Sequence, residues 1–137
     1  MKSKGLLIAG MIGVAAGLAA LASGCGGSKA GKETHFGEPF TQAPQVAIAQ
    51  LLEAPDAYRR KPVRVTGTIE RQCPAAGCWF FIRDGQGRSL KVELGDYFEK
   101  LPQNLGNEAE AEGEWIRQGE GHAFIGTRVT FRKKGTP

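Results

Sequence analysis

Apolar and polar residues alternate along the second half of this chain, and this period of two constrains the fold more than any other feature. Residues 63–70, 90–94 and 109–115 each place apolar or small side chains on one side and charged or hydroxyl side chains on the other. Such alternation is typical of strands that bury one face. Residues 79–82 are apolar on both sides, and residues 124–131 complete a set of five expected strands. We therefore predict a mainly β domain.

The turns between these strands, and the glycines inside them, restrict the possible β architectures. Glycine-containing turn signals lie at 84–87 and 119–121, and residues 97–101 predict a short helix or turn between the third and fourth strands. Glycines inside strands suit the sharp coiling of a small barrel, and they occur at Gly67, Gly113 and Gly126. We predict a small five-stranded OB-like barrel, with an SH3-like barrel or a β-sandwich fragment as the alternative.

A short helix is expected before the barrel, over residues 45–54. Pro44 suits its first turn, and the apolar spacing predicts one buried face. That face would carry Ile48, Leu51, Leu52 and Pro55.

The first 24 residues predict an export signal. Lys2 and Lys4 precede an uncharged apolar run over residues 5–21, and small residues then lead directly to Cys25. This arrangement resembles the lipobox of bacterial lipoproteins, which implies that the Cys25 thiol is acylated; Ala22 departs from the leucine that is usual there. The alternatives are a cleaved soluble protein and an uncleaved anchor, for which this run is of borderline length.

These observations divide the chain into three parts. We expect a lipoprotein signal peptide at 1–24, a lipid-anchored flexible tether at 25–38, and the OB-like domain at 39–137. Residue 26 is Gly26 rather than aspartate, a pattern that implies the outer membrane in lipoproteins of this kind. The predicted location is therefore the cell envelope, with the domain facing the periplasm and the membrane as one partner.

Charge and motifs exclude several classes of function. Without Lys2 and Lys4 the chain carries 16 basic and 14 acidic side chains, a net charge of +2, so its basicity does not indicate nucleic-acid binding. Ser89 has no recognised catalytic partners, and no glycine-rich loop opens a helix, so we expect no catalytic set and no nucleotide site. The alternating glutamates are expected to form a solvated strand face; they are Glu108, Glu110, Glu112 and Glu114.

A resemblance to a known family rests on residues 58–115. The stretch 61–69, the Cys73-Pro74-Ala75-Ala76-Gly77-Cys78-Trp79 element and the Asp84-Gly85 turn resemble the bacterial family named domain of unknown function 4920. Tyr97-Phe98-Glu99-Lys100-Leu101-Pro102 departs from the fuller aromatic pattern of that family. The resemblance implies an exported, OB-like domain and implies no reaction.

Cys73 and Cys78 have three interpretations. In an oxidising compartment a pair at this spacing forms a disulfide if the loop turns back, and Pro74 and Gly77 favour such a turn. A second interpretation is a zinc or copper site completed by His35 or His122. A third is a redox-active dithiol, although these cysteines lack the helix N-terminus that lowers a thiol pKa.

Two hypotheses for function follow. The first is a non-enzymatic accessory or binding lipoprotein of the envelope, with no cofactor, whose recognition edge is the cysteine loop with Trp79 as its anchor. Its partner would be an envelope protein or a small ligand, and not a nucleic acid. The alternative is a periplasmic metal-binding or thiol-redox protein that uses Cys73 and Cys78.

Overall fold

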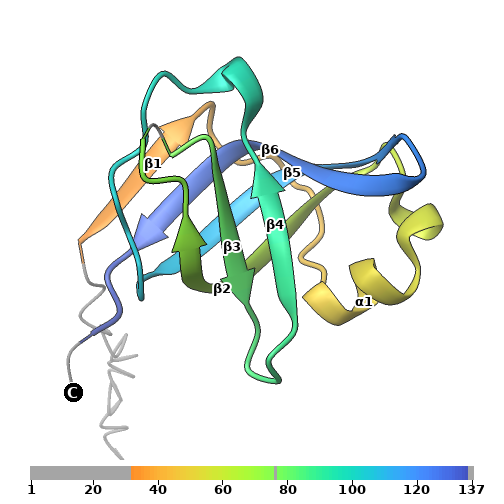
Figure 1. Cartoon of the computed structure of the whole chain (residues 1–137), viewed down its shortest axis with the longest axis horizontal. Helices are drawn as coiled ribbons and strands as arrows, with labels where there is room; N and C mark the ends of the chain where they lie inside the picture. Colours follow the sequence, from red (N-terminus) through yellow and green to blue (C-terminus); the bar gives the residue numbers. More distant parts are fainter. Residues whose placement is uncertain (1–31, 76, 136–137) are drawn as a thin grey trace, which may run out of the picture.

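The computed structural model describes residues 32–75 and 77–135, and these form one β-rich domain (Figure 1). The expected signal peptide, Cys25 and most of the expected tether lie outside the described residues. No helix in the described part of the chain is long and apolar enough to cross a membrane. The elements in chain order are β1 (Glu33–Gly37), α1 (Ile48–Glu53), η1 (Pro55–Tyr58), β2 (Pro62–Gln72), β3 (Trp79–Arg83), β4 (Ser89–Glu93), η2 (Gly95–Tyr97), β5 (Glu108–Gln118) and β6 (Gly121–Arg132).

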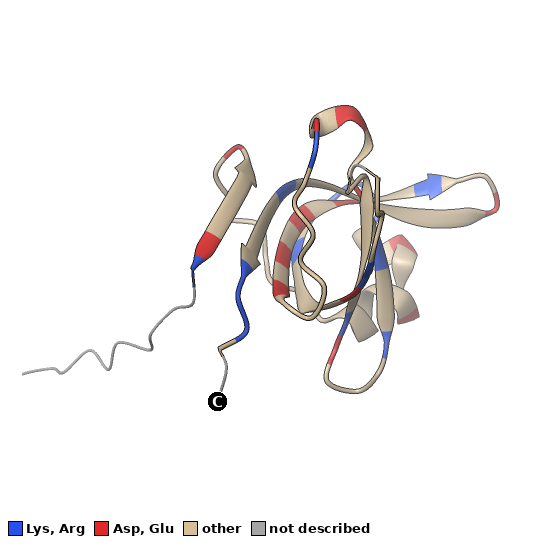
Figure 2. Ribbon diagram, turned by 60° about the vertical axis from the view of Figure 1, so that its left-hand side comes forward, with Lys and Arg blue, Asp and Glu red and all other residues tan. Residues whose placement is uncertain are grey.

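Five of the strands close into a barrel. β2 pairs with β3, β3 with β4, β4 with β6, β6 with β5, and β5 again with β2. Only the β4–β6 pair among these is parallel, and the ring is visible end-on in Figure 2. A closed five-stranded barrel with this crossed order is the OB-like architecture, so the predicted fold class is confirmed.

A close backbone approach explains one of the strand glycines. The register of β5 and β6 shifts at Gly113, which lies opposite Gly126. A Cβ atom at Gly113 would lie 2.0 Å from the carbonyl oxygen of Ile125, so no larger residue fits without moving the backbone. The barrel can therefore coil sharply at this point, as the sequence predicted.

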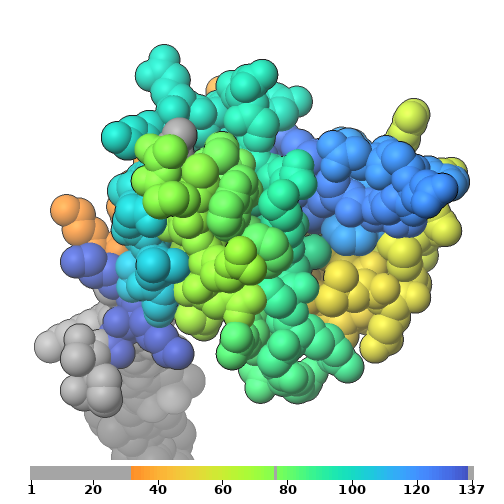
Figure 3. Space-filling model, in the orientation of Figure 1, coloured from red at the N-terminus to blue at the C-terminus, as the bar shows by residue number. Residues whose placement is uncertain are grey.

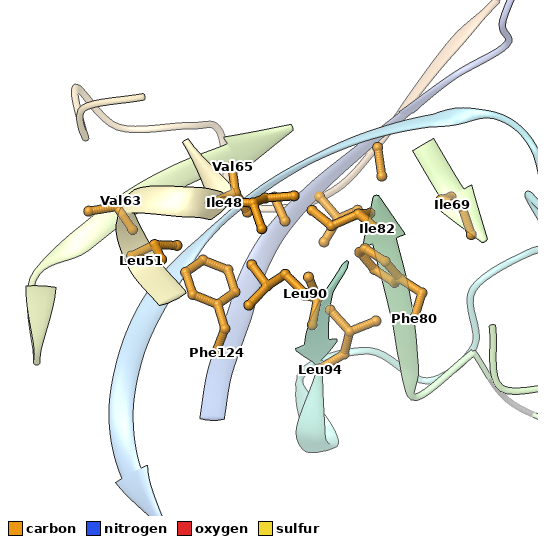
Figure 4. Close-up of a cluster of buried hydrophobic side chains, with 14 of the residues drawn as sticks. Ile48, Leu51, Val63, Val65, Ile69, Phe80, Ile82, Leu90, Leu94 and Phe124 are labelled. Carbon is orange, nitrogen blue, oxygen red and sulfur yellow. The ribbon is translucent and has the colours of Figure 1, made fainter. Parts of the chain in front are cut away.

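The alternating residues fill the barrel interior, as Figure 4 shows for the centre of the core. Burial follows the predicted period of two in β2, β4 and β5. In β3 the residues alternate as well: Phe80 and Ile82 are fully buried, whereas Trp79 and Phe81 point outward and are half-buried. The core also includes Ile48, Leu51, Val63, Val65, Ile69, Leu90, Val92, Leu94, Leu101, Phe124 and Phe131.

The helix before the barrel is shorter than the sequence predicted. It spans Ile48–Glu53 instead of residues 45–54. The expected first turn is extended, because the backbone N–H of Val46 donates to the carbonyl of Arg64 at 2.8 Å and thereby pairs with β2. Leu52, which was expected on the buried face, is 42 % exposed.

An extended segment over residues 38–47, here called the strap, crosses the outer face of the barrel. Its main anchor is Glu112, which is 1 % exposed. The Glu112 carboxylate accepts hydrogen bonds from the backbone N–H and the hydroxyl of Thr41, both at 2.9 Å, and pairs with Arg128 at 3.3 Å. Arg128 also donates to the Pro39 carbonyl at 2.8 Å, so the same two side chains hold the strap and β5 together.

The expectation of a solvated glutamate face is therefore wrong for Glu112. Its neighbours on β5 are also engaged: Glu110 pairs with Arg64 at 3.3 Å, and Glu108 pairs with Arg132 at 2.6 Å. Of the four alternating glutamates, only Glu114 is exposed. Period-two alternation placed these residues on the outer face, but a segment more than 60 residues away in sequence covers that face.

β1 adds a sixth strand outside the ring. It pairs antiparallel with β6, for example His35 with Thr130, at the edge of the sheet (Figure 1). Residues 33–37 belong to the segment that we expected to be a flexible tether. Backbone pairing with β6 makes residues 33–37 a strand of the sheet and not a flexible segment.

Candidate functional site

The ends of β2 and β3 hold the two cysteines together. Cys73 follows the last residue of β2, and Cys78 precedes Trp79, the first residue of β3. The N–H of Cys73 donates to the Trp79 carbonyl at 3.0 Å, and the N–H of Gly77 donates to the Cys73 carbonyl at 3.3 Å. These bonds turn the loop back on itself and leave the two Sγ atoms 3.0 Å apart.

Gly77 allows the loop to close in this form. Its φ of +66° lies in the left-handed region, which glycine adopts without steric cost. A Cβ atom at this position would also lie 2.9 Å from the Leu101 side chain and from its carbonyl oxygen. The predicted turn residue therefore has two functions: it reverses the chain, and it lets the loop pack against the segment between β4 and β5.

Gln72 fixes the loop against that segment. Gln72 is 7 % exposed. Its side-chain amide donates to the Pro102 carbonyl at 2.9 Å and accepts from the Asn104 N–H at 2.8 Å. Gln103 adds a bond to the Cys73 carbonyl at 2.9 Å. Sequence reasoning missed this clamp, because it joins residues about 30 positions apart and glutamine has no pattern that predicts such a role. Figure 3 shows the cysteine loop lying against residues of the segment between β4 and β5.

The two thiols differ in environment. Cys73 is buried and Cys78 is exposed. The hydrogen bond to Cys73, followed by desolvation, raises the pKa of the Cys78 thiol above its ordinary value of 9.0. This shift favours the thiol form of Cys78 over the thiolate. Dithiols that act as redox catalysts typically have a lowered thiol pKa, so this environment does not favour a catalytic redox pair.

The predicted metal set is not assembled. Among the described residues, no group of three histidine, cysteine or acidic side chains could hold a metal ion. Two thiolates on one tetrahedral zinc ion, with bonds of about 2.3 Å, would be about 3.8 Å apart, whereas these sulfur atoms are 3.0 Å apart. The structure thus brings Cys73 and Cys78 together and leaves both histidines elsewhere.

Both histidines have other partners. His35, on β1, hydrogen-bonds Thr130 through Nδ1 at 2.7 Å and donates from Nε2 to the Glu38 carbonyl at 2.8 Å. His122, at the start of β6, stacks on Trp115 with ring centroids 5.7 Å apart, and its Nε2 lies 3.5 Å from Asp56. The position of His35 depends on pairing between β1 and the distant β6, whereas the stacking of His122 on Trp115 arises within the β5–β6 hairpin.

An aromatic row lies beside the cysteine loop on the outer face of β3. The rings of Trp79 and Phe81 meet edge to face, with centroids 5.7 Å apart. The Arg71 guanidinium lies 4.9 Å from the Phe81 ring, and the Lys91 ammonium lies 5.9 Å from the Trp79 ring. We predicted Trp79 as the anchor of a recognition edge; Phe81 lies on the same face, because alternate residues of a strand point the same way.

Together these features define an OB-like barrel with a preorganised pair of cysteines and an outward aromatic row at one end of β3. No protein-family model and no curated protein matches this chain. Among solved structures, the hypothetical protein ygiW from E. coli is similar at 12 % sequence identity, with a TM-score of 0.48, over 70 % of this chain and 96 % of that chain.

Proposed function

We propose that this chain is an exported lipoprotein, acylated at Cys25, whose barrel is a binding module of the cell envelope. Its recognition edge would be the cysteine loop and the aromatic row, with Trp79 as the anchor. The observation that carries this proposal is the approach of the Cys73 and Cys78 sulfur atoms to 3.0 Å beside Trp79. The charged start, apolar run and small residues before Cys25 support the export and acylation.

In this proposal Cys73 and Cys78 form a disulfide. The two thiols lose two protons and two electrons to a disulfide oxidant of the periplasm, which is reduced to its dithiol, and one S–S bond forms. The Gln72 clamp and the turn at Gly77 support this chemistry, because they already hold the loop in the closed form. The disulfide would then fix the position of Trp79.

The aromatic row supports a binding role. Half-buried aromatic rings present a large apolar area at low entropic cost, and such residues are enriched where proteins recognise partners. Arg71 and Lys91 lie near these rings, which favours a ligand that combines a flat apolar surface with negative charge. This chemistry fits either a small ligand or a segment of an envelope protein.

The state of the cysteines in cells tests this proposal. Protein from membrane fractions, trapped with acid and then alkylated, should carry no label at Cys73 and Cys78 and should show the mass of an acylated Cys25. Alkylation of both loop cysteines in freshly trapped protein would contradict the disulfide. Peptide mapping separates these sites from Cys25.

Lipid anchoring is tested separately with Cys25→Ser, which should move the protein from the membrane fraction to the soluble fraction. An unchanged distribution would contradict lipid anchoring. For the recognition edge, Trp79→Ala should abolish the crosslinks that the anchored protein makes to envelope components in intact cells. The matched control, Tyr97→Ala, removes another exposed aromatic residue and should leave the crosslinks intact.

A further inference from the structure

Three arginines meet at the end of the barrel where the β5–β6 hairpin projects. Arg59 and Arg60 follow η1, and Arg117 lies on β5 near the tip of the hairpin. Together with Ile116 they line an open hollow of about 500 Å³. The hairpin and η1 lie at the far end of the domain from β1 in Figure 1. Nothing along the sequence joins these positions, because Arg117 is more than 50 residues away from the other two.

The backbone explains how the cluster is assembled. Arg59 forms an isolated bridge with Trp115, and the N–H of Arg60 donates to the Trp115 carbonyl at 3.0 Å. Trp115 is buried, so the chain after η1 is fixed to a rigid part of β5. Arg117 lies two residues further along the same strand. The arginines are therefore positioned by strand pairing and not by a mobile loop.

Arg60 has an unfavourable backbone conformation. Its φ is +57°, and it is the only described residue other than glycine with a positive φ. A side chain in this region crowds the following carbonyl oxygen, which is why chains usually place glycine or asparagine there. Backbone strain of this kind clusters at functional sites, and the hollow beside Arg60 is the candidate site at this end of the domain. Here a glycine would make the same turn, but it would remove a guanidinium from the hollow.

Within the described residues, these three arginines also differ from most of the others in their lack of ion pairs. Arg59, Arg60 and Arg117 are exposed, and none forms an ion pair with a carboxylate of the described residues. Most other arginines of the domain do form such pairs, including Arg64, Arg83, Arg88, Arg128 and Arg132. These three guanidinium groups are therefore not engaged by ion pairs and are available to an external anion.

We propose that Arg59, Arg60 and Arg117 form a binding site for a phosphoryl group. The guanidinium fork matches two oxygen atoms of one phosphate, and three such groups around a single hollow match a group of more than one negative charge. The open shape of the hollow suits a phosphoryl group that projects from a larger molecule, such as a lipid headgroup or an envelope polymer. The site is separate from the cysteine loop and does not depend on its oxidation state.

Pyrophosphate is the probe for a direct test. The protein is titrated at constant ionic strength, with sodium chloride replacing pyrophosphate in the reference, and binding is followed by calorimetry and by NMR chemical shifts. Saturable binding is expected, with the largest shifts at Arg59, Arg60 and Arg117. Arg60→Gly and Arg117→Gln should each weaken it by about tenfold, the loss expected for one charge-assisted hydrogen bond.

Two controls make the test specific. Arg88→Gln removes the same charge from the turn between β3 and β4, and it should leave the affinity unchanged. Arg60→Gly should keep or raise the melting temperature, because glycine adopts the positive φ without strain. Absence of saturable pyrophosphate binding, or an equal loss of affinity in Arg88→Gln, would overturn the proposal.

A second arm distinguishes the sources of the phosphoryl group. Vesicles of phosphatidylglycerol with phosphatidylcholine are compared with vesicles of phosphatidylcholine alone by cosedimentation. Binding only to the former that is lost in Arg60→Gly assigns the site to a lipid headgroup. Pyrophosphate binding without such cosedimentation assigns it to a soluble or polymeric phosphate. Both outcomes support the phosphoryl site.

Discussion

A disulfide bond between Cys73 and Cys78 should stabilise the domain by an amount that depends on the length of the loop it closes. The closed loop contains six residues, counted from Cys73 to Cys78. The chain-entropy relation gives about 2 kcal/mol for a loop of this length. For a domain of about 100 residues, this corresponds to a rise in melting temperature of about 10 °C.

The geometry indicates that little of this gain is lost to strain. The two sulfur atoms must approach by about 1 Å to reach the S–S bond length of about 2.05 Å. The loop backbone is already held by the bond between Cys73 and Trp79 and by the Gln72 clamp. Gly77→Ala should reduce the gain, because its Cβ atom would push the loop away from Leu101.

The assay is thermal unfolding of the mature protein, oxidised and then reduced with a phosphine, with both states verified by mass. The double variant Cys73→Ser/Cys78→Ser should melt at the temperature of the reduced protein and should not respond to the reductant. An oxidised protein that melts at or below the temperature of the reduced protein would refute the reasoning. That result would mean that the native loop does not accept the bond.

Three further predictions concern single side chains. Glu112→Ala should lower the free energy of unfolding, measured in urea, by about 3 kcal/mol, because it leaves buried partners unpaired. The control Glu114→Ala should change this free energy by less than about 0.5 kcal/mol, and equal effects of the two variants would contradict the anchoring role of Glu112. Cys73→Ala should speed alkylation of Cys78 just below its ordinary pKa, because it removes the hydrogen bond that raises that pKa; an unchanged rate would contradict this cause. A hydrogen bond from Ser89, followed by one from Arg83, lowers the pKa of Glu70 below its ordinary value of 4.5. The contribution of Glu70 to stability is therefore present above pH 4.5 and is lost as the pH falls through the lowered pKa. Glu70→Gln should flatten the acid limb of a profile of melting temperature against pH, and an unchanged limb would contradict the assignment.

Local pattern was a reliable guide to the strands and an incomplete guide to their surroundings. Alternation predicted which side chains of β2, β4 and β5 enter the core, because successive residues of a strand face opposite sides. It did not predict the burial of Glu112, because the strap that covers this residue begins more than 60 residues earlier. The helix was predicted too long for a similar reason: Val46 pairs with Arg64, and this long-range bond outweighs helical propensity.

The sequence by itself determined the class of the fold, the positions of the five barrel strands and the presence of a cysteine pair at a turn, since all three depend on neighbouring residues. Only the tertiary structure decided what surrounds that pair. It separated His35 and His122 from the cysteines and placed Gln72 as a clamp on the loop. It also brought Arg117 to Arg59 and Arg60. Each of these outcomes depends on which distant strands pair and in what register, and residue spacing along one chain does not specify that.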